Sequence, residues 1–184
     1  AKSGGNYIFS AQAWRDHGPQ ADDSMMISTA FRQNLRRAGH PPVEIEIDWY
    51  RRYRLMRMHT ACHLLTVVCP FPITGASVGE EESRVDFDIP DAAFTKEEVT
   101  ARLMDLVNGA HPVFTKLIAE ADLAANSALV KSKNVRPPSG AGTIRLVCIG
   151  EEGTVDSQPC GGTHVSTTEE VGAIHIGKIE KKGR

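Results

Sequence analysis

The sequence lacks the long apolar segments of membrane and secreted chains. Its best apolar run, residues 64–69, stops at Pro70, far short of the roughly 20 residues that a membrane helix needs. Residues 1–30 hold no apolar block of the kind found in signal peptides, so we expect a cytoplasmic protein without a membrane partner. No internal repeat or low-complexity segment interrupts the 184 residues, which leave room for one full domain and a small appendage.

The sequence also has little net charge and few cysteines. The formal net charge is −2, which excludes a generic nucleic-acid coating protein and restricts any nucleic-acid contact to local patches. Only four cysteines occur, and without a signal peptide they are expected to be thiols or metal ligands rather than disulfides. A hydrophobic content of 41% with 24% charged residues predicts an ordinary globular core.

The predicted elements mix strands and helices without a regular βαβ rhythm, which favours an α+β fold whose mainly antiparallel sheet packs against helices. Residues 1–42, punctuated by glycine and proline, are expected to form a β-rich segment or the remnant of a small domain, ahead of a main domain at 43–184. Hydrophobic patterning predicts strands at 43–47, 84–89, 143–149 and 171–180, and helices at 49–68, 95–108 and 119–128, whereas 113–118 fits either.

Two groups of residues carry chemistry. His59 and His63 lie four apart in the long predicted helix, where their imidazoles share one face and can reach a single ion. About a hundred residues later come Cys160 and His164, separated by a sequence whose Gly161 and Gly162 favour a tight turn over a helix. Three imidazoles and one thiolate form a borderline-soft tetrahedral set, which suits zinc.

Each half of this set has a simpler explanation when taken alone. A pair of histidines four apart on a helix arises by chance about as often as a ligand pair, and the cysteine could lie in a loop beside a solvated histidine. Their conjunction is stronger. Zinc-protease chemistry is not expected, because Thr60 stands where such enzymes place a glutamate.

The two segments resemble one known family. Residues 54–65 (RLMRMHTACHLL) look like the first motif of the alanyl-tRNA synthetase editing domain and its freestanding relatives, the AlaX proteins. Residues 158–165 (QPCGGTHV) look like their second motif, which is shared more loosely with threonyl-tRNA synthetase editing domains. The resemblance spans about residues 43–182, and it implies that the main domain, 43–184, is an editing domain.

The resemblance implies what this domain does. It places zinc on His59, His63, Cys160 and His164, which then form both the metal site and the catalytic site. It implies hydrolysis of the ester that joins a wrong amino acid, serine or glycine, to the acceptor end of alanine tRNA. Because 184 residues leave no room for an aminoacylation domain, we expect editing in trans. A metal-free variant, with an imidazole as the general base, stays open.

Other assignments are hypotheses of lower weight. The substrate pocket is predicted to include Thr60, Cys62, Thr74 and Ser77, although Cys62 replaces a threonine usual in the family and is equally explained as a small buried side chain. Lys178, Lys181, Lys182 and Arg184 form a cationic end that we expect to contact tRNA phosphates. A second basic patch, residues 51–57, is explained slightly better as a solvated helix face.

Two other functions stay open, together with one question about the metal. The same four ligands could close a structural zinc site in a non-catalytic tRNA-binding module, or the chain could be a fragment of a longer alanyl-tRNA synthetase. Catalytic zinc sites keep one position open, so one of the four ligands must be loose unless the metal expands to five-coordinate. We expect that ligand to be His164, because it follows the flexible Gly161–Gly162 turn.

Overall fold

The computed structural model describes residues 5–13, 47–90, 94–135, 137, 140 and 142–182. Within these ranges the chain forms two antiparallel sheets and three helices, together with three short 3-10 turns. In chain order the elements are β1 (Gly5–Ala13), α2 (Trp49–Val68), β2 (Ile73–Ser77), β3 (Glu82–Ile89), α3 (Lys96–Asn108), β4 (Val113–Ala119), α4 (Glu120–Ala125), η1 (Ser127–Leu129), β5 (Thr143–Ile149), η2 (Glu151–Gly153), β6 (Asp156–Pro159), η3 (Thr168–Val171) and β7 (Ile174–Lys182).

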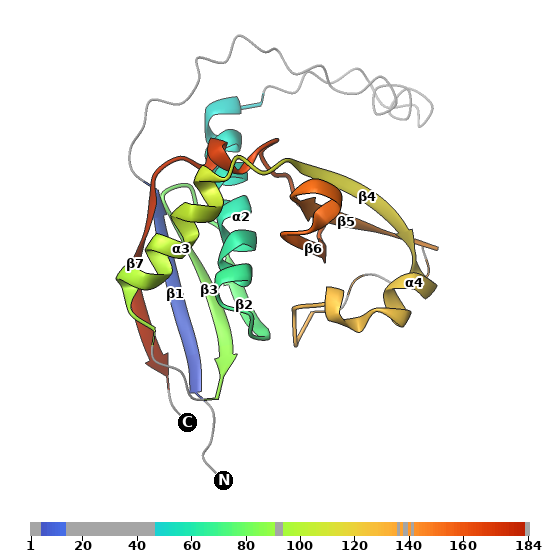
Figure 1. The fold of residues 1–184 in the computed structure, drawn as a ribbon, viewed down its shortest axis with the longest axis horizontal. Coiled ribbons are helices and arrows are strands. Elements are labelled where there is room, and N and C mark those ends of the chain that lie inside the picture. The colour runs from blue at the N-terminus through green and yellow to red at the C-terminus, as the bar shows by residue number, and fades with distance from the viewer. Residues whose placement is uncertain are drawn as a thin grey trace, which may run out of the picture.

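The two sheets differ in size and flank the long helix. The larger has strand order β2-β3-β1-β7 and the smaller β4-β5-β6, and all the pairings within them are antiparallel. Helix α3 packs against β7, whereas α2 contacts β1 and β3 on one side and β6 on the other. Figure 1 shows α2 running between the large sheet and the small one. The α+β fold with a mainly antiparallel sheet is thereby confirmed.

Helix α2 begins and ends where the sequence predicts. The Asp48 side chain accepts a hydrogen bond from Arg51 N at 2.9 Å, which satisfies one of the free N–H groups of the first turn. From residue 57 onward almost every side chain is buried, because both sheets cover this half of the helix. The helix ends at Val68, before Pro70 would remove a backbone donor. None of the described helices is long and apolar enough to cross a membrane.

The other predicted elements are found with small shifts. Thr95 and Glu98 form the reciprocal capping box that opens α3. The ambiguous run 113–118 is a strand, because β4 pairs residue for residue with β5, from Val113 opposite Ile149 onward. A helix within 119–128 is present but shorter, and the final strand starts at Ile174 rather than at residue 171.

The N-terminal strand belongs to the large sheet. β1 pairs with β3 on one side and with β7 on the other, so residues 5–13 lie between strands from the middle and the end of the chain. The predicted boundary near residue 42 and most of the predicted strand at 43–47 lie outside the described residues. The division at that point stays a prediction, although β1 itself is integrated with the main domain.

The core gathers around α2 and α3. Its main cluster includes Leu64, Phe87 and Leu103, none of which is exposed to solvent. A separate small cluster under the second sheet consists of Leu123, Ile144, Leu146 and Cys148. The long helix is therefore held on one side by a large apolar core, and its other side faces the small sheet and the loop that follows β6.

Candidate metal centre

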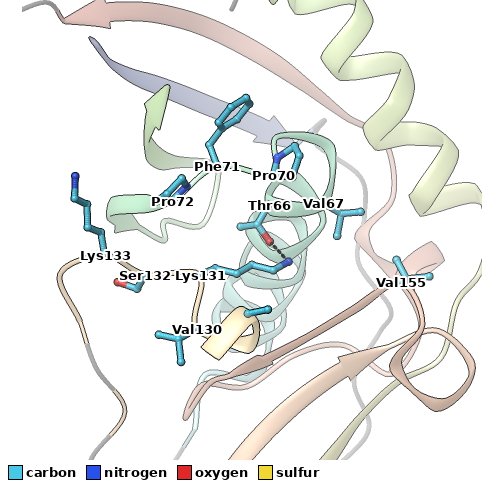
Figure 2. A pocket seen from close by; sticks show the side chains of 11 residues that line it. Thr66, Val67, Pro70, Phe71, Pro72, Val130, Lys131, Ser132, Lys133 and Val155 are labelled. Atoms are coloured by element: carbon cyan, nitrogen blue, oxygen red, sulfur yellow. Dashed lines mark hydrogen bonds between the residues drawn. The ribbon is translucent and has the colours of Figure 1, made fainter. Parts of the chain in front are cut away.

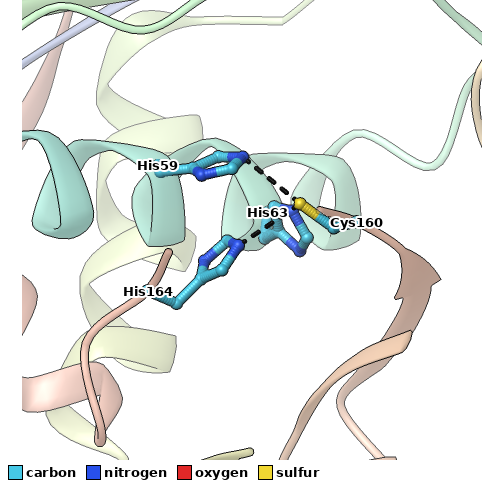
Figure 3. A group of neighbouring side chains, drawn as sticks. All are labelled: His59, His63, Cys160 and His164. Atoms are coloured by element: carbon cyan, nitrogen blue, oxygen red, sulfur yellow. Dashed lines mark hydrogen bonds between the residues drawn. The ribbon is translucent and has the colours of Figure 1, made fainter. Parts of the chain in front are cut away.

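The two motifs predicted from sequence meet in space. His59 and His63 project from the middle of α2, Cys160 follows the last residue of β6, and His164 lies in the loop that leads to η3. Figure 3 shows the four side chains pointing toward one another from these separate elements. Their ligand atoms all lie within 4.8 Å of one another, and they form a group of the described residues able to hold a metal ion.

The spacing within this cluster fits a tetrahedral zinc ion. Cys160 Sγ lies 3.6 Å from His59 Nε2 and 3.5 Å from His164 Nε2. Zinc–sulfur and zinc–nitrogen bonds of about 2.3 and 2.05 Å at a tetrahedral angle place the two ligand atoms about 3.6 Å apart. The rings of His59 and His164 are stacked with their centroids 4.1 Å apart, whereas the His63 ring meets both of them edge-on. The donor types and these two sulfur–nitrogen separations are therefore compatible with zinc.

The environment of Cys160 favours its thiolate. Burial alone would raise the pKa of this thiol, but hydrogen bonds from His164, His59, His63 and the Gly162 N–H outweigh burial and lower the pKa to about 3. The thiolate is the form that ligates metals. By contrast, burial raises the pKa of the Cys62 thiol to about 12, and this cysteine contacts Ser83 in the core instead of the cluster.

His164 is fixed more firmly than its glycine-rich loop suggests. The hydroxyl of Thr60 lies 3.1 Å from His164 Nδ1, which leaves Nε2 facing Cys160. The same hydroxyl accepts a hydrogen bond from Val165 N at 3.3 Å and donates one to Met56 O at 3.0 Å. The helix thus holds both the imidazole and the backbone beside it, which weakens the physical basis for treating His164 as the loose ligand.

His63 is oriented by a carboxylate that the sequence analysis did not single out. Its Nδ1 lies 3.4 Å from Asp156 Oδ2, without the alignment of a full hydrogen bond, so Nε2 is the nitrogen left for a metal. Burial opposes the charged forms of both groups, but contacts with Asp156 and Cys160 raise the pKa of His63, and contacts with His63, Lys131 and Gln158 lower that of Asp156. Carboxylates commonly orient metal-binding histidines in this way.

The loop carrying Cys160 is held by two further features. Arg145 on β5 donates to the carbonyls of Cys160 and Gly162, at 2.5 and 2.9 Å. Gly162 packs so closely on His59 that a Cβ there would overlap the imidazole ring. The double glycine therefore allows a close approach between loop and helix at its second position. The sequence shows this only as a turn signal.

An open cavity adjoins the thiolate. It has a volume of about 430 Å³, and its lining includes Cys160, Gly161, Arg145 and Gln158. Pockets of this size bind small ligands or parts of larger ones. The cavity is lined mainly by residues of the small sheet and of the segment after η1, and Cys160 is the member of the cluster that lines it.

The predicted substrate-binding residues are not gathered in one place. Thr60 touches the cluster but is fully buried, and Cys62 is 6% exposed within the main core. Thr74 donates a hydrogen bond to Asp86 O at 3.3 Å, and Ser77 is exposed at the end of β2. Of the four, Thr60 has a contact that bears directly on a metal ligand.

The basic side chains of the two patches differ in their contacts and exposure. On α2, Arg51 and Arg54 pair with Glu80, and buried Arg57 donates twice to Val171 O. In the C-terminal patch, Lys178 is exposed but pairs with Glu180, and Lys181 is also exposed on β7. The Lys182 side chain and Arg184 lie outside the described residues.

The close packing at Gly162 gives a sharp test of the cluster. Gly162→Ala is expected to weaken zinc binding at least tenfold, because the new Cβ would displace the His59 ring. Gly161→Ala is the matched control, since a Cβ there meets no atom within 4 Å. Competition with a chromogenic chelator measures both affinities. Equal zinc affinities for the two variants would contradict the packing described above.

Comparison with known proteins identifies related chains. Residues 144–184 match the family described as the threonyl and alanyl tRNA synthetase second additional domain. The chain is 37% identical over 149 residues to the alanyl-tRNA editing protein AlaX-M of Methanosarcina barkeri, which covers 75% of this chain and 58% of that protein. It is 32% identical over 149 residues to AlaX-M of Saccharolobus solfataricus, with the same coverage of 75% and 58%.

A synthetase is similar over a comparable stretch. The chain is 33% identical over 158 residues to the alanine–tRNA ligase of Pyrobaculum neutrophilum, which covers 78% of this chain and 17% of that enzyme. The chain thus spans little more than half of the AlaX-M proteins and a small part of the ligase. By sequence it is a relative of the AlaX-type alanyl-tRNA editing proteins and of the second additional domain of threonyl- and alanyl-tRNA synthetases.

Proposed function

We propose that the chain hydrolyses the ester of mischarged alanine tRNA, acting in trans on seryl-tRNA and glycyl-tRNA with the help of zinc. The observation that carries this proposal is the convergence of three histidines and one cysteine beside an open cavity. The relatives named as alanyl-tRNA editing proteins supply the substrate class. An aminoacyl ester is already activated, so its hydrolysis needs a positioned water and stabilisation of the developing oxyanion.

In this proposal some residues hold the zinc ion and others orient its ligands. His59, His63, Cys160 and His164 would hold zinc, which supplies a Lewis acid able to polarise the ester carbonyl and activate water. Thr60 and Asp156 fix the orientation of His164 and His63 through the ring nitrogens that face away from Cys160. Arg145 fixes the Cys160 loop, so the ester would approach a rigid set of ligands from the adjoining cavity.

A closed structural zinc site in a tRNA-binding module is the second candidate. It is favoured by the count of four protein ligands, since structural zinc sites are closed and catalytic ones keep a position open. The two proposals separate on activity, because both predict bound zinc whereas only the first predicts turnover. The remaining hypothesis is that the chain is a fragment of a longer alanyl-tRNA synthetase. It concerns the length of the natural chain and does not change the site.

The deacylase proposal predicts a specific pattern of activity. The zinc-loaded protein should release serine from seryl-tRNA much faster than alanine from alanyl-tRNA, because a site that hydrogen-bonds the serine hydroxyl leaves that group unpaired with alanine. Cys160→Ala should lose both zinc and activity, whereas Cys69→Ala, which removes a buried thiol outside the cluster, should keep both. The measurements are metal analysis and release of labelled amino acid.

The outcomes distinguish the candidates. Zinc bound with no deacylation of any aminoacyl-tRNA would favour the structural site. Full activity in metal-free protein would overturn the proposed role of zinc, but the proposal that the chain is a hydrolase would stand. Equal rates on seryl-tRNA and alanyl-tRNA would show that the pocket does not discriminate as proposed.

The C-terminal lysines are proposed to contact tRNA phosphates. Each lysine–phosphate contact steepens the fall of log affinity with log salt by about 0.7 to 0.9. Changing Lys178, Lys181 and Lys182 together to alanine should flatten this slope and weaken tRNA binding, with zinc content unchanged. Filter binding at several salt concentrations measures the slope, and the same slope in variant and parent would assign these lysines to solvent.

A further inference from the structure

A buried polar network lies behind His63 and ends at Lys131. The lysine follows η1 and reaches back between the two sheets, where its Nζ donates a hydrogen bond to Thr66 Oγ1 at 3.0 Å and pairs with Asp156. Figure 2 shows the lysine extended toward Thr66 along the wall of a cavity of about 670 Å³. The Asp156 side chain is fully buried, whereas that of Lys131 is 24% exposed.

The backbone around Lys131 is fixed to the large sheet. Lys131 O accepts a hydrogen bond from Ile73 N at 2.9 Å, and Lys133 N donates to Ile73 O at 2.8 Å. The segment therefore lies along β2, while the carboxylate that Lys131 pairs with begins β6 of the small sheet. The ammonium group thus connects the two sheets directly behind the cluster.

Both oxygens of the Asp156 carboxylate have partners. Oδ1 pairs with Lys131, and Oδ2 accepts a hydrogen bond from Gln158 Nε2 at 2.7 Å and faces His63 Nδ1 at 3.4 Å. Because Lys131 occupies one oxygen, the carboxylate cannot rotate away from His63 without breaking a partly buried ion pair. Leaving one partner of such a pair unpaired in a protein interior is costly.

We propose that Lys131 is a positioning residue for the metal site and that it acts on His63 through Asp156. The lysine holds the carboxylate so that the His63 proton stays on Nδ1 and Nε2 faces the other three ligands. This inference rests on the metal-binding part of the proposed function. It assigns Lys131 an internal role and separates it from Lys133, two residues along, whose side chain is 58% exposed and pairs with Asp88.

The test compares the two lysines in the full chain. Lys131→Met keeps much of the side-chain length and removes the charge, and it should weaken zinc affinity by about 10- to 100-fold, as is usual when a group orienting a metal ligand is lost. Lys133→Met is the matched control and should bind zinc like the parent. Lys131→Arg should recover most of the loss, because it restores a cation to Asp156. Chelator competition gives the affinities.

Two spectroscopic readouts are independent of activity, and the second of them needs no variant. In the zinc-loaded parent, the His63 Nδ1 proton should give a slowly exchanging downfield resonance, which should shift or broaden in Lys131→Met. In the unmodified protein, the Lys131 ammonium protons should exchange far more slowly than those of Lys133.

The failures are distinguishable. If the parent binds no zinc tightly, the metal-dependent function itself falls. If the parent binds zinc but Lys131→Met binds it equally well with an unchanged His63 resonance, the positioning role is overturned. Should Lys131→Met fail to fold, ammonium exchange in the parent decides, and equal exchange rates for Lys131 and Lys133 would overturn the inference.

Discussion

The structure depends on a close approach between the middle of α2 and the loop that follows β6. The two imidazoles of the helix can share an ion with Cys160 and His164 only if the loop backbone contacts His59, and Gly162 permits this because it has no side chain to intervene. On the helix side, the Thr60 hydroxyl holds the same loop through hydrogen bonds with His164 Nδ1 and Val165 N. The cluster is thus a junction between helix and loop, and neither element could form it alone.

The surrounding fold serves to hold this junction in place. The large sheet and α3 bury one side of α2 in an apolar core, which fixes the rotation of the helix and therefore the direction of both histidines. The small sheet positions the loop, since Cys160 follows β6 directly and Arg145 on the neighbouring β5 holds the loop carbonyls. Asp156 and Lys131 link the two halves through buried contacts behind His63.

The sequence predicts the parts of this arrangement that depend on local pattern. The positions of α2 and α3, which are capped at Asp48 and Thr95, and the spacing of His59 and His63 are predictable because each depends on residues close together in the sequence. The strands β2 and β6 are not predicted from the sequence, because they are short and have no run of alternating apolar residues. The pairing of β1 with β7 joins opposite ends of the chain, and no local pattern encodes it.

The supporting residues of the site are harder to predict for the same reason. Asp156 and Lys131 are not singled out in the sequence, because they lie 25 positions apart and meet only in the folded chain. Thr60 is predicted as a pocket residue, yet its hydroxyl contacts His164 and the loop backbone. The Gly161–Gly162 pair predicts flexibility, whereas its second glycine is packed against His59.

The central claim is that three histidines and one cysteine form a single zinc centre. X-ray absorption spectroscopy of the zinc-loaded protein tests it most directly, because nitrogen and sulfur neighbours differ in distance. The account predicts about one sulfur at roughly 2.3 Å and about three nitrogens at roughly 2.0–2.1 Å. A shell without sulfur, or one with two or more sulfurs, would contradict it.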